Sequence, residues 1–198
     1  FWLHGRGVGA NTLAGLFPGT CDGGDARELE AALNKAIEYE TEVEGVYREA
    51  AEKVANPEGR KALETLAREE GYHVDFLRRQ LENLAGGGAL ETEKLATRLP
   101  GSGEIRAGLE RLQEKLDPSP DAHELEVLRQ ALNVERQTAL FYKQMAREFT
   151  GEREQAFFER FCEIEEGHLN LVQAEMDAIT KTGVWFDFLE FDLEGEKG

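Results

Sequence analysis

The sequence predicts an all-α protein: a four-helix bundle made of two duplicated helix pairs, with a long crossover between the second and third helices. Three observations support this class. Only 5 of the 198 residues are proline, while 40% are hydrophobic and 32% charged, a composition typical of globular α-helical proteins. Four long stretches repeat their apolar residues with the period of an α-helix. The second half of the chain also repeats the first at a constant offset.

The first helix pair follows a glycine-rich start. Residues 1–24 lack periodicity, which predicts an irregular N-terminal arm. Apolar residues then recur at helical spacing after Asp25, the expected N-cap, until Asn56-Pro57 interrupts the pattern. Pro57 suits the first turn of the next helix, whose pattern ends at the glycines of 86–88. We therefore expect residues 25–85 to form a helical hairpin.

The second helix pair follows a long connection. Residues 86–120 can cross the bundle and contain one short amphipathic segment, about 103–116. Two more helices are expected within 121–182, separated by Thr150-Gly151, which completes a bundle over 25–183. The aromatic tail, 184–198, alternates apolar and acidic residues, which predicts an extended segment. So much aromatic surface should be covered, either across the bundle end or in a dimer contact.

Charge and composition narrow the range of partners. The formal net charge of -17 argues against nucleic acid and anionic membranes, because both attract clustered lysine and arginine. Two cysteines without a CxxC pair are too few for a disulfide framework. No stretch approaches the roughly 20 apolar residues of a membrane span, and no basic region followed by an apolar run opens the chain. We therefore expect a cytoplasmic location and no membrane partner.

The repeat pairs the residues that carry chemistry. AIEYETEVEGVYREAA (36–51) aligns with ALNVERQTALFYKQMA (131–146) at an offset of 95 residues without a gap. The same offset pairs Glu40 with Glu135, Tyr47 with Tyr142, Glu70 with Glu165 and His73 with His168. Each half thus contains a Glu followed, on the next helix, by Glu-x-x-His. One such motif alone is usually an ordinary surface pair, but two at matched positions indicate a common site.

This pattern predicts a metal centre. Glu and His at positions i and i+3 share one helix face, and here that face is the apolar one. Ionised groups buried there without partners would each lose several kcal/mol of solvation. Two divalent cations would balance four carboxylates, and this arrangement is the one found in two-metal carboxylate bundles. The predicted ligands are Glu40, Glu70, His73, Glu135, Glu165 and His168.

Three further residues lie near the predicted ligands: two tyrosines and one cysteine. Tyr47 and Tyr142 lie two turns from Glu40 and Glu135 on the same faces, so they either donate hydrogen bonds to ligands or pack in the core. Cys162 lies one turn before Glu165 and is interpreted as a small buried side chain rather than a redox thiol.

The repeated AIEYETEVEGVYREAA and EEGYH segments resemble the rubrerythrin branch of the ferritin-like superfamily over about residues 26–183. The resemblance implies a two-iron centre in which Glu70 and Glu165 bridge the metals. It also implies that Glu40 and Glu135 are terminal ligands and that each metal binds one His. Members reduce hydrogen peroxide or dioxygen with electrons from an external donor, or oxidise and store iron. A homodimer or larger homo-oligomer is the corresponding expectation.

Two departures from the family pattern limit these expectations. The chain has no CxxC and therefore no rubredoxin-like electron relay of its own. The peroxidases of the family also commonly carry a seventh carboxylate three residues after the third ligand Glu, where this chain has Thr138 and, in the first half, Val43. We expect an oxidoreductase that reduces peroxide or dioxygen. The alternatives are a ferroxidase or iron-storage protein, a manganese or zinc centre, and a purely structural bundle.

Overall fold

Four long helices dominate the computed structural model, which describes residues 24–97, 99–101, 103, 105, 122–182 and 185. In chain order the elements are α1 (Gly24–Lys53), α2 (Pro57–Ala85), the 3-10 turn η1 (Thr92–Lys94), α4 (Ala122–Glu148) and α5 (Glu152–Thr182). The described residues contain no strand. The predicted arm, most of the predicted segment 103–116 and the tail apart from Trp185 lie outside the described residues.

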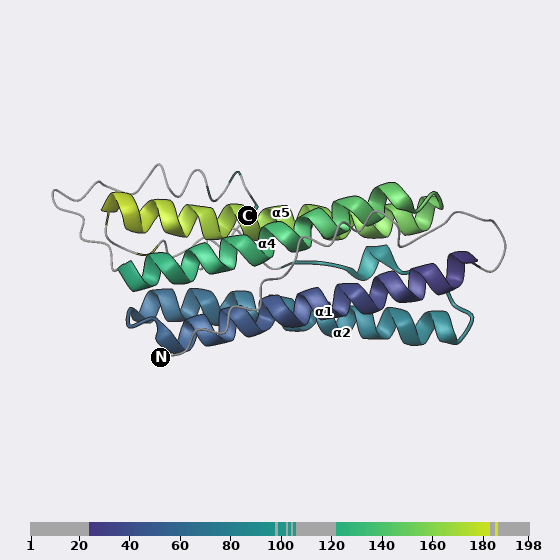
Figure 1. Ribbon diagram of the computed structural model, residues 1–198, viewed down its shortest axis with the longest axis horizontal. Coiled ribbons are helices and arrows are strands. Elements are labelled where there is room, and N and C mark those ends of the chain that lie inside the picture. Colours follow the sequence, from purple (N-terminus) through teal and green to yellow (C-terminus); the bar gives the residue numbers. More distant parts are fainter. Residues whose placement is uncertain are drawn as a thin grey trace, which may run out of the picture.

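The helices form two hairpins that pack on each other. Helix α1 packs along α2, α4 packs along α5, and α1 also contacts α4 (Figure 1). All four axes run close to parallel along the length of the molecule in this view. The all-α four-helix bundle predicted from the duplication is therefore confirmed.

The ends of α2 show why the sequence places helix boundaries well. The Asn56 side chain accepts hydrogen bonds from the backbone N–H groups of Glu58 (2.9 Å) and Gly59 (3.1 Å), and Pro57 needs no such partner. Beyond α2, Gly87 adopts a positive φ of 80° that favours glycine. Helix α1 begins at Gly24, so Asp25, the expected N-cap, lies inside the first turn instead; the difference is within the usual variation of helix ends.

The core divides into two hydrophobic clusters along the bundle. One cluster is rich in phenylalanine and includes Phe157, Phe158 and Phe161, all fully buried. The other consists mainly of leucine, valine and alanine from all four helices, and Leu63 and Leu171 are among its fully buried members. The buried polar residues between these clusters are therefore enclosed by apolar side chains on both sides.

Trp185 closes one end of the bundle. It is 4% exposed, and its indole N–H donates to Glu124 Oε2 of α4 at 3.0 Å. A Cβ added to Gly59 of α2 would lie 2.3 Å from the Trp185 ring, so glycine leaves the space that the indole occupies. For this residue, packing across the bundle end is observed; the dimer contact predicted as an alternative for the tail concerns residues outside the described ones.

The crossover is fixed to α2 by buried polar side chains. Gln80 accepts a hydrogen bond from the backbone N–H of Glu91 at 2.9 Å, and Thr97 donates to Glu69 at 3.1 Å.

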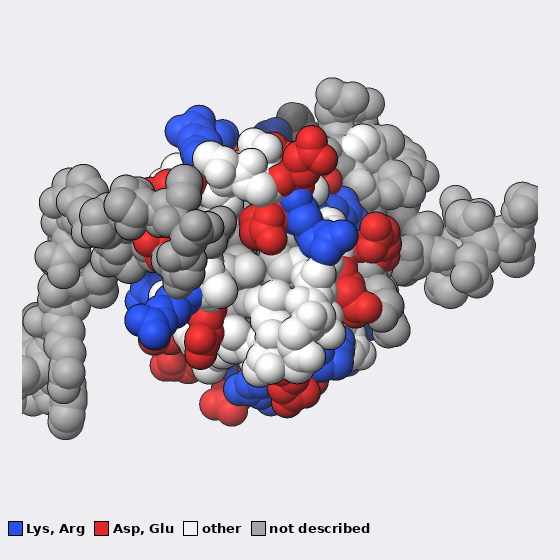
Figure 2. Space-filling model, turned by 90° about the vertical axis from the view of Figure 1, so that its right-hand side faces the viewer, with Lys and Arg blue, Asp and Glu red and all other residues white. Residues whose placement is uncertain are grey.

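On the bundle end seen in Figure 2, acidic and basic residues are interspersed around uncharged ones. None of the helices described is apolar over a length that could cross a membrane.

Candidate metal centre

The six predicted ligand residues meet at the centre of the bundle. Glu40 comes from α1, Glu70 and His73 from α2, Glu135 from α4, and Glu165 and His168 from α5. Each is at most 1% exposed. One ligand atom from each of Glu70, His73, Glu165 and His168 can be chosen so that all lie within 4.8 Å of one another. The helical faces predicted from the sequence therefore bring the residues together.

Each imidazole faces three carboxylates through Nδ1. For His73, this atom lies 3.2 Å from Glu40, 3.1 Å from Glu70 and 3.5 Å from Glu165. The Nδ1 of His168 lies 2.7 Å from Glu70, 3.7 Å from Glu165 and 3.9 Å from Glu135. The two rings are parallel, with centroids 5.4 Å apart. The duplication thus produces two equivalent half-sites beside each other.

The four carboxylates divide into two kinds by position. Glu70 directs Oε2 toward His73 and Oε1 toward His168, and Glu165 directs Oε1 toward His73 and Oε2 toward His168. Glu40 contacts only the first imidazole, and Glu135 only the second. Two carboxylates therefore span both half-sites, while each of the others belongs to one.

The tyrosines link the two halves of the repeat. The Tyr47 hydroxyl of α1 donates to Glu135 Oε1 of α4, and the Tyr142 hydroxyl of α4 donates to Glu40 Oε1 of α1. Each phenol is fully buried. Each tyrosine thus orients the carboxylate of the opposite half rather than the Glu on its own helix.

Burial and crowded charge alter the protonation of the cluster. Burial raises the pKa of Glu40 to about 7, and burial together with the charge of Glu70 raises the pKa of Glu135 to about 8. Burial and three neighbouring carboxylates raise the pKa of Glu165 well above its ordinary value. Burial acts to lower the pKa of His73, but hydrogen bonds to Glu40 and Glu70 raise it to about 10. The metal-free cluster therefore retains protons at neutral pH.

Several buried atoms have no protein partner, and their chemistry fits metal ions. Among the described residues, no hydrogen bond is made by one oxygen of Glu135, both oxygens of Glu165 and Nε2 of each histidine, whereas Glu70 Oε1 and His168 Nδ1 have each other as an ion-pair partner at 2.7 Å. Such groups are normally satisfied when buried. Carboxylate oxygen and imidazole nitrogen are common ligands of iron, manganese and zinc. The residues present therefore fit a metal site.

A narrow cleft lies above the cluster between α1 and α4. Its lining residues form three pairs at the 95-residue offset: Tyr39 with Val134, Glu42 with Gln137, and Val43 with Thr138. Of these pairs, only Val43 and Thr138 stand out in the sequence, at the position of the family's seventh carboxylate. Thr138 is fully buried, and its hydroxyl donates to the Val134 carbonyl of its own helix at 3.1 Å. The cleft therefore ends against Val43 and Thr138, each three residues after a carboxylate of the cluster.

Cys162 differs from its predicted environment. Its side chain is half-buried rather than buried, with Sγ 3.8 Å from Glu166 Oε1 and 3.9 Å from the Ala139 carbonyl. Burial and the charge of Glu166 raise the pKa of the thiol. The sequence pattern located its helix turn correctly but not its place in a surface groove between α4 and α5.

The fold and the site together define a ferritin-like four-helix bundle with a buried cluster of carboxylates and histidines that could hold metal ions. The family model for rubrerythrin matches residues 31–176, and the chain belongs to the rubrerythrin family. Comparison with curated proteins and with solved structures gives no significant match.

Proposed function

We propose that Glu40, Glu70, His73, Glu135, Glu165 and His168 hold two iron ions, and that the loaded centre reduces hydrogen peroxide or dioxygen. The observation that carries this proposal is the position of Glu70 and Glu165, each with one oxygen toward either imidazole. This geometry suits carboxylates that bridge two ions. Four carboxylates are also the number whose charge two divalent ions offset.

An iron pair supplies redox chemistry at such a site when bound. The protein's own side chains determine its surroundings. Tyr47 and Tyr142 orient the terminal carboxylates, and each phenol holds its proton because burial and the adjacent carboxylate raise its pKa. Phe161 packs edge-on against His73 at 5.6 Å and stacks on Tyr142 at 4.6 Å, which excludes water from this side.

The cleft between α1 and α4 supports a small oxidant rather than an organic substrate. It is narrow, and its inner end is closed by fully buried side chains, Val43 and Thr138. Val43 and Thr138 each follow a carboxylate of the cluster by three residues, so the inner end of the cleft lies about one helical turn from Glu40 and Glu135. We therefore propose the cleft as the oxidant's entry.

A second candidate function is iron oxidation or storage without peroxidase turnover. The observation that favours it is Thr138, which occupies the position of the seventh carboxylate in many peroxidases of the family. Its hydroxyl is bonded to its own helix. The protein would then supply six ligands to the centre and no seventh carboxylate. Zinc or manganese is the alternative metal content, which elemental analysis of the purified protein distinguishes.

Rapid mixing tests the proposed activity. Protein loaded with iron and reduced without oxygen should be mixed with hydrogen peroxide and, separately, with air-saturated buffer. Much faster oxidation by peroxide supports the peroxidase, and fast oxidation by dioxygen alone supports an oxidase. Similar slow rates with both, together with iron beyond the site stoichiometry, would favour iron oxidation and storage. Sedimentation of the same sample tests the expected homodimer or larger homo-oligomer.

A further inference from the structure

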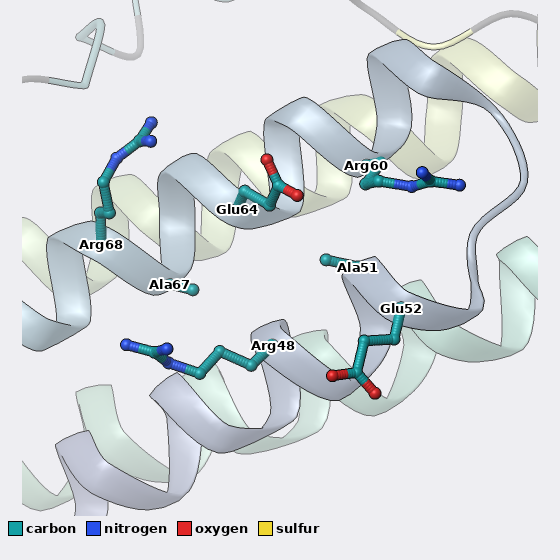
Figure 3. A pocket seen from close by; sticks show the side chains of 7 residues that line it. All are labelled: Arg48, Ala51, Glu52, Arg60, Glu64, Ala67 and Arg68. Carbon is teal, nitrogen blue, oxygen red and sulfur yellow. The ribbon is translucent and has the colours of Figure 1, made fainter.

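The duplication creates a surface groove on each hairpin, and the two grooves differ in charge. The groove between α1 and α2 has a volume of about 580 Å³. Its lining residues are Arg48, Ala51, Glu52, Arg60, Glu64, Ala67 and Arg68 (Figure 3). The groove between α4 and α5 is smaller, about 320 Å³, and includes the residues at the 95-residue offset from each of these. One groove can therefore serve as the internal reference for the other.

The α1–α2 groove is the more basic of the two. At the 95-residue offset, Arg60 corresponds to Gln155 and Arg68 to Glu163, while Glu52 corresponds to Arg147. Three arginines and two glutamates line the α1–α2 groove, whereas Lys143 and Arg147 face three glutamates in the α4–α5 groove. The whole chain has a net charge of -17, so the charge of this groove is opposite in sign to that of the protein. Such a groove attracts acidic groups.

Two of its arginines have no carboxylate partner among the described residues. Arg48 pairs with Glu44, at 3.0 Å from Nε and 2.5 Å from Nη2. By contrast, Arg60 donates to the Val54 carbonyl at 3.3 Å, and Arg68 donates to the Thr65 hydroxyl at 2.8 Å. In Figure 3, Arg48 extends into the space between the helices, and Arg60 extends toward the α1–α2 connection. Most donors of Arg60 and Arg68 are thus available to a partner.

The position of Arg60 is electrostatically unfavourable for the isolated protein. It lies in the first turns of α2, where the helix dipole already contributes positive potential and a cation costs stability. The corresponding residue of α5, Gln155, is neutral. The helix end and the arginine therefore add to the same positive field.

From this groove we propose that the outer face of the α1–α2 hairpin docks the acidic surface of an electron-carrier protein. Arg60 and Arg68 are eight residues apart, about 12 Å along the helix, which is too far for one phosphate but suits several carboxylates. Ala51 and Ala67 form a floor of short side chains, at 5% and 4% exposure. A flat protein surface can therefore approach the helices closely.

The groove is also close to the metal centre. Ala67 precedes Glu70 by three residues on α2, and Arg48 directly follows Tyr47, whose hydroxyl bonds Glu135. A docked carrier would therefore be separated from the cluster by one layer of helix. This docking role rests on the proposed function: reduction of one peroxide to two waters takes two electrons and two protons, so two one-electron carriers are oxidised each time.

The test uses the iron-loaded full chain and a plant-type [2Fe–2S] ferredoxin as an acidic probe. Calorimetry at low salt measures binding, and stopped flow measures electron transfer from the reduced ferredoxin. Arg60→Gln with Arg68→Glu gives the α1–α2 groove the residues of its counterpart at these two positions. The control, Arg78→Gln with Arg129→Glu, makes the same change in net charge at exposed arginines elsewhere. Reduction by dithionite serves as the reference that needs no docking.

We expect the groove variant to lose about tenfold in ferredoxin affinity and electron-transfer rate, the control to change little, and dithionite reduction to remain constant. The reverse variant, Gln155→Arg with Glu163→Arg, should gain weak binding at the second groove. Absence of binding to the unaltered protein at low salt, or equal losses in both charge variants, would overturn the docking role. Displacement of ferredoxin by millimolar phosphate at constant ionic strength would also overturn it, in favour of a small-anion site. Failure of dithionite-reduced protein to react with peroxide would instead refute the proposed function, and the binding data would still decide on docking.

Discussion

Replacement of Tyr47 by phenylalanine removes one hydroxyl and keeps the ring that packs in the core. The hydroxyl donates to Glu135 Oε1, and the other oxygen of this carboxylate has no protein partner. In the metal-free protein the pKa of Glu135 is about 8, so this group is mostly protonated at pH 7. A bound metal requires the ionised form, to which the phenol donates more strongly. The substitution should therefore weaken the metal-bound state more than the metal-free state.

The expected magnitude follows from the type of bond. A hydrogen bond to a charged group contributes about 1.5–3 kcal/mol, and loss of an outer partner of a ligand typically reduces metal affinity by about 10–100-fold. We expect a loss in this range for Tyr47→Phe and, by the symmetry of the site, for Tyr142→Phe. Competition against a chelator with a known metal affinity measures it, and melting of the metal-free protein measures the remaining structural effect.

Tyr39→Phe is the matched control. Tyr39 lies on the same helix and packs against Phe141 at 4.9 Å, but its hydroxyl makes no hydrogen bond to any of the six predicted ligands. Its metal affinity should be that of the unaltered protein. Unchanged affinity in Tyr47→Phe, or the same loss in Tyr39→Phe, would refute the orienting role of the buried phenol.

Three further predictions concern stability and protonation. Gly59→Ala should lower the free energy of unfolding by about 1–3 kcal/mol, because the new methyl overlaps the Trp185 ring. Chemical denaturation monitored by tryptophan fluorescence measures this change, and an unchanged midpoint would contradict the packing. Thr138→Glu should destabilise the metal-free protein by about 1–3 kcal/mol, since the added carboxylate is unpaired until metal binds, and the metal-loaded variant should regain this stability. Calorimetric melting of both forms measures the effect, and an equal change in melting temperature in the two forms would contradict it. The pKa values of Glu135 and His73 are higher in the folded protein than their ordinary values, so the folded state binds more protons than the unfolded chain. The stability of the metal-free protein should therefore fall as pH rises from about 5 toward 10. Metal loading at pH 7 should release protons, measurable with a pH indicator.

The duplication explains why so much of the site could be predicted. A constant offset pairs residues without any structural information, and helical periodicity places each pair on an apolar face. The boundaries of α2 were equally accessible, because Asn56, Pro57 and the following glycines each have a specific effect on the backbone. Local rules of this kind act through a few neighbouring residues and need no tertiary contacts.

The features that were not predictable depend on contacts between distant segments. Periodicity assigns Tyr47 to a face but cannot say that its hydroxyl reaches Glu135 on α4 rather than Glu40 on its own helix. In the sequence Gln80 is an isolated polar residue, and only the folded chain brings the backbone N–H of Glu91 within hydrogen-bond distance of it. Trp185 likewise finds its position only through the space above Gly59. Each depends on how one chain segment approaches another.

The metal content of the purified protein tests the central claim most directly. Protein from iron-supplemented cells should contain about two metal ions per chain by elemental analysis. The double variant Glu70→Ala with Glu165→Ala should lose both ions, because it removes the two carboxylates that span the half-sites. Glu64→Ala with Glu159→Ala, which alters two exposed glutamates at the same 95-residue offset, should retain them. Two ions per chain in the first double variant would contradict the proposed centre.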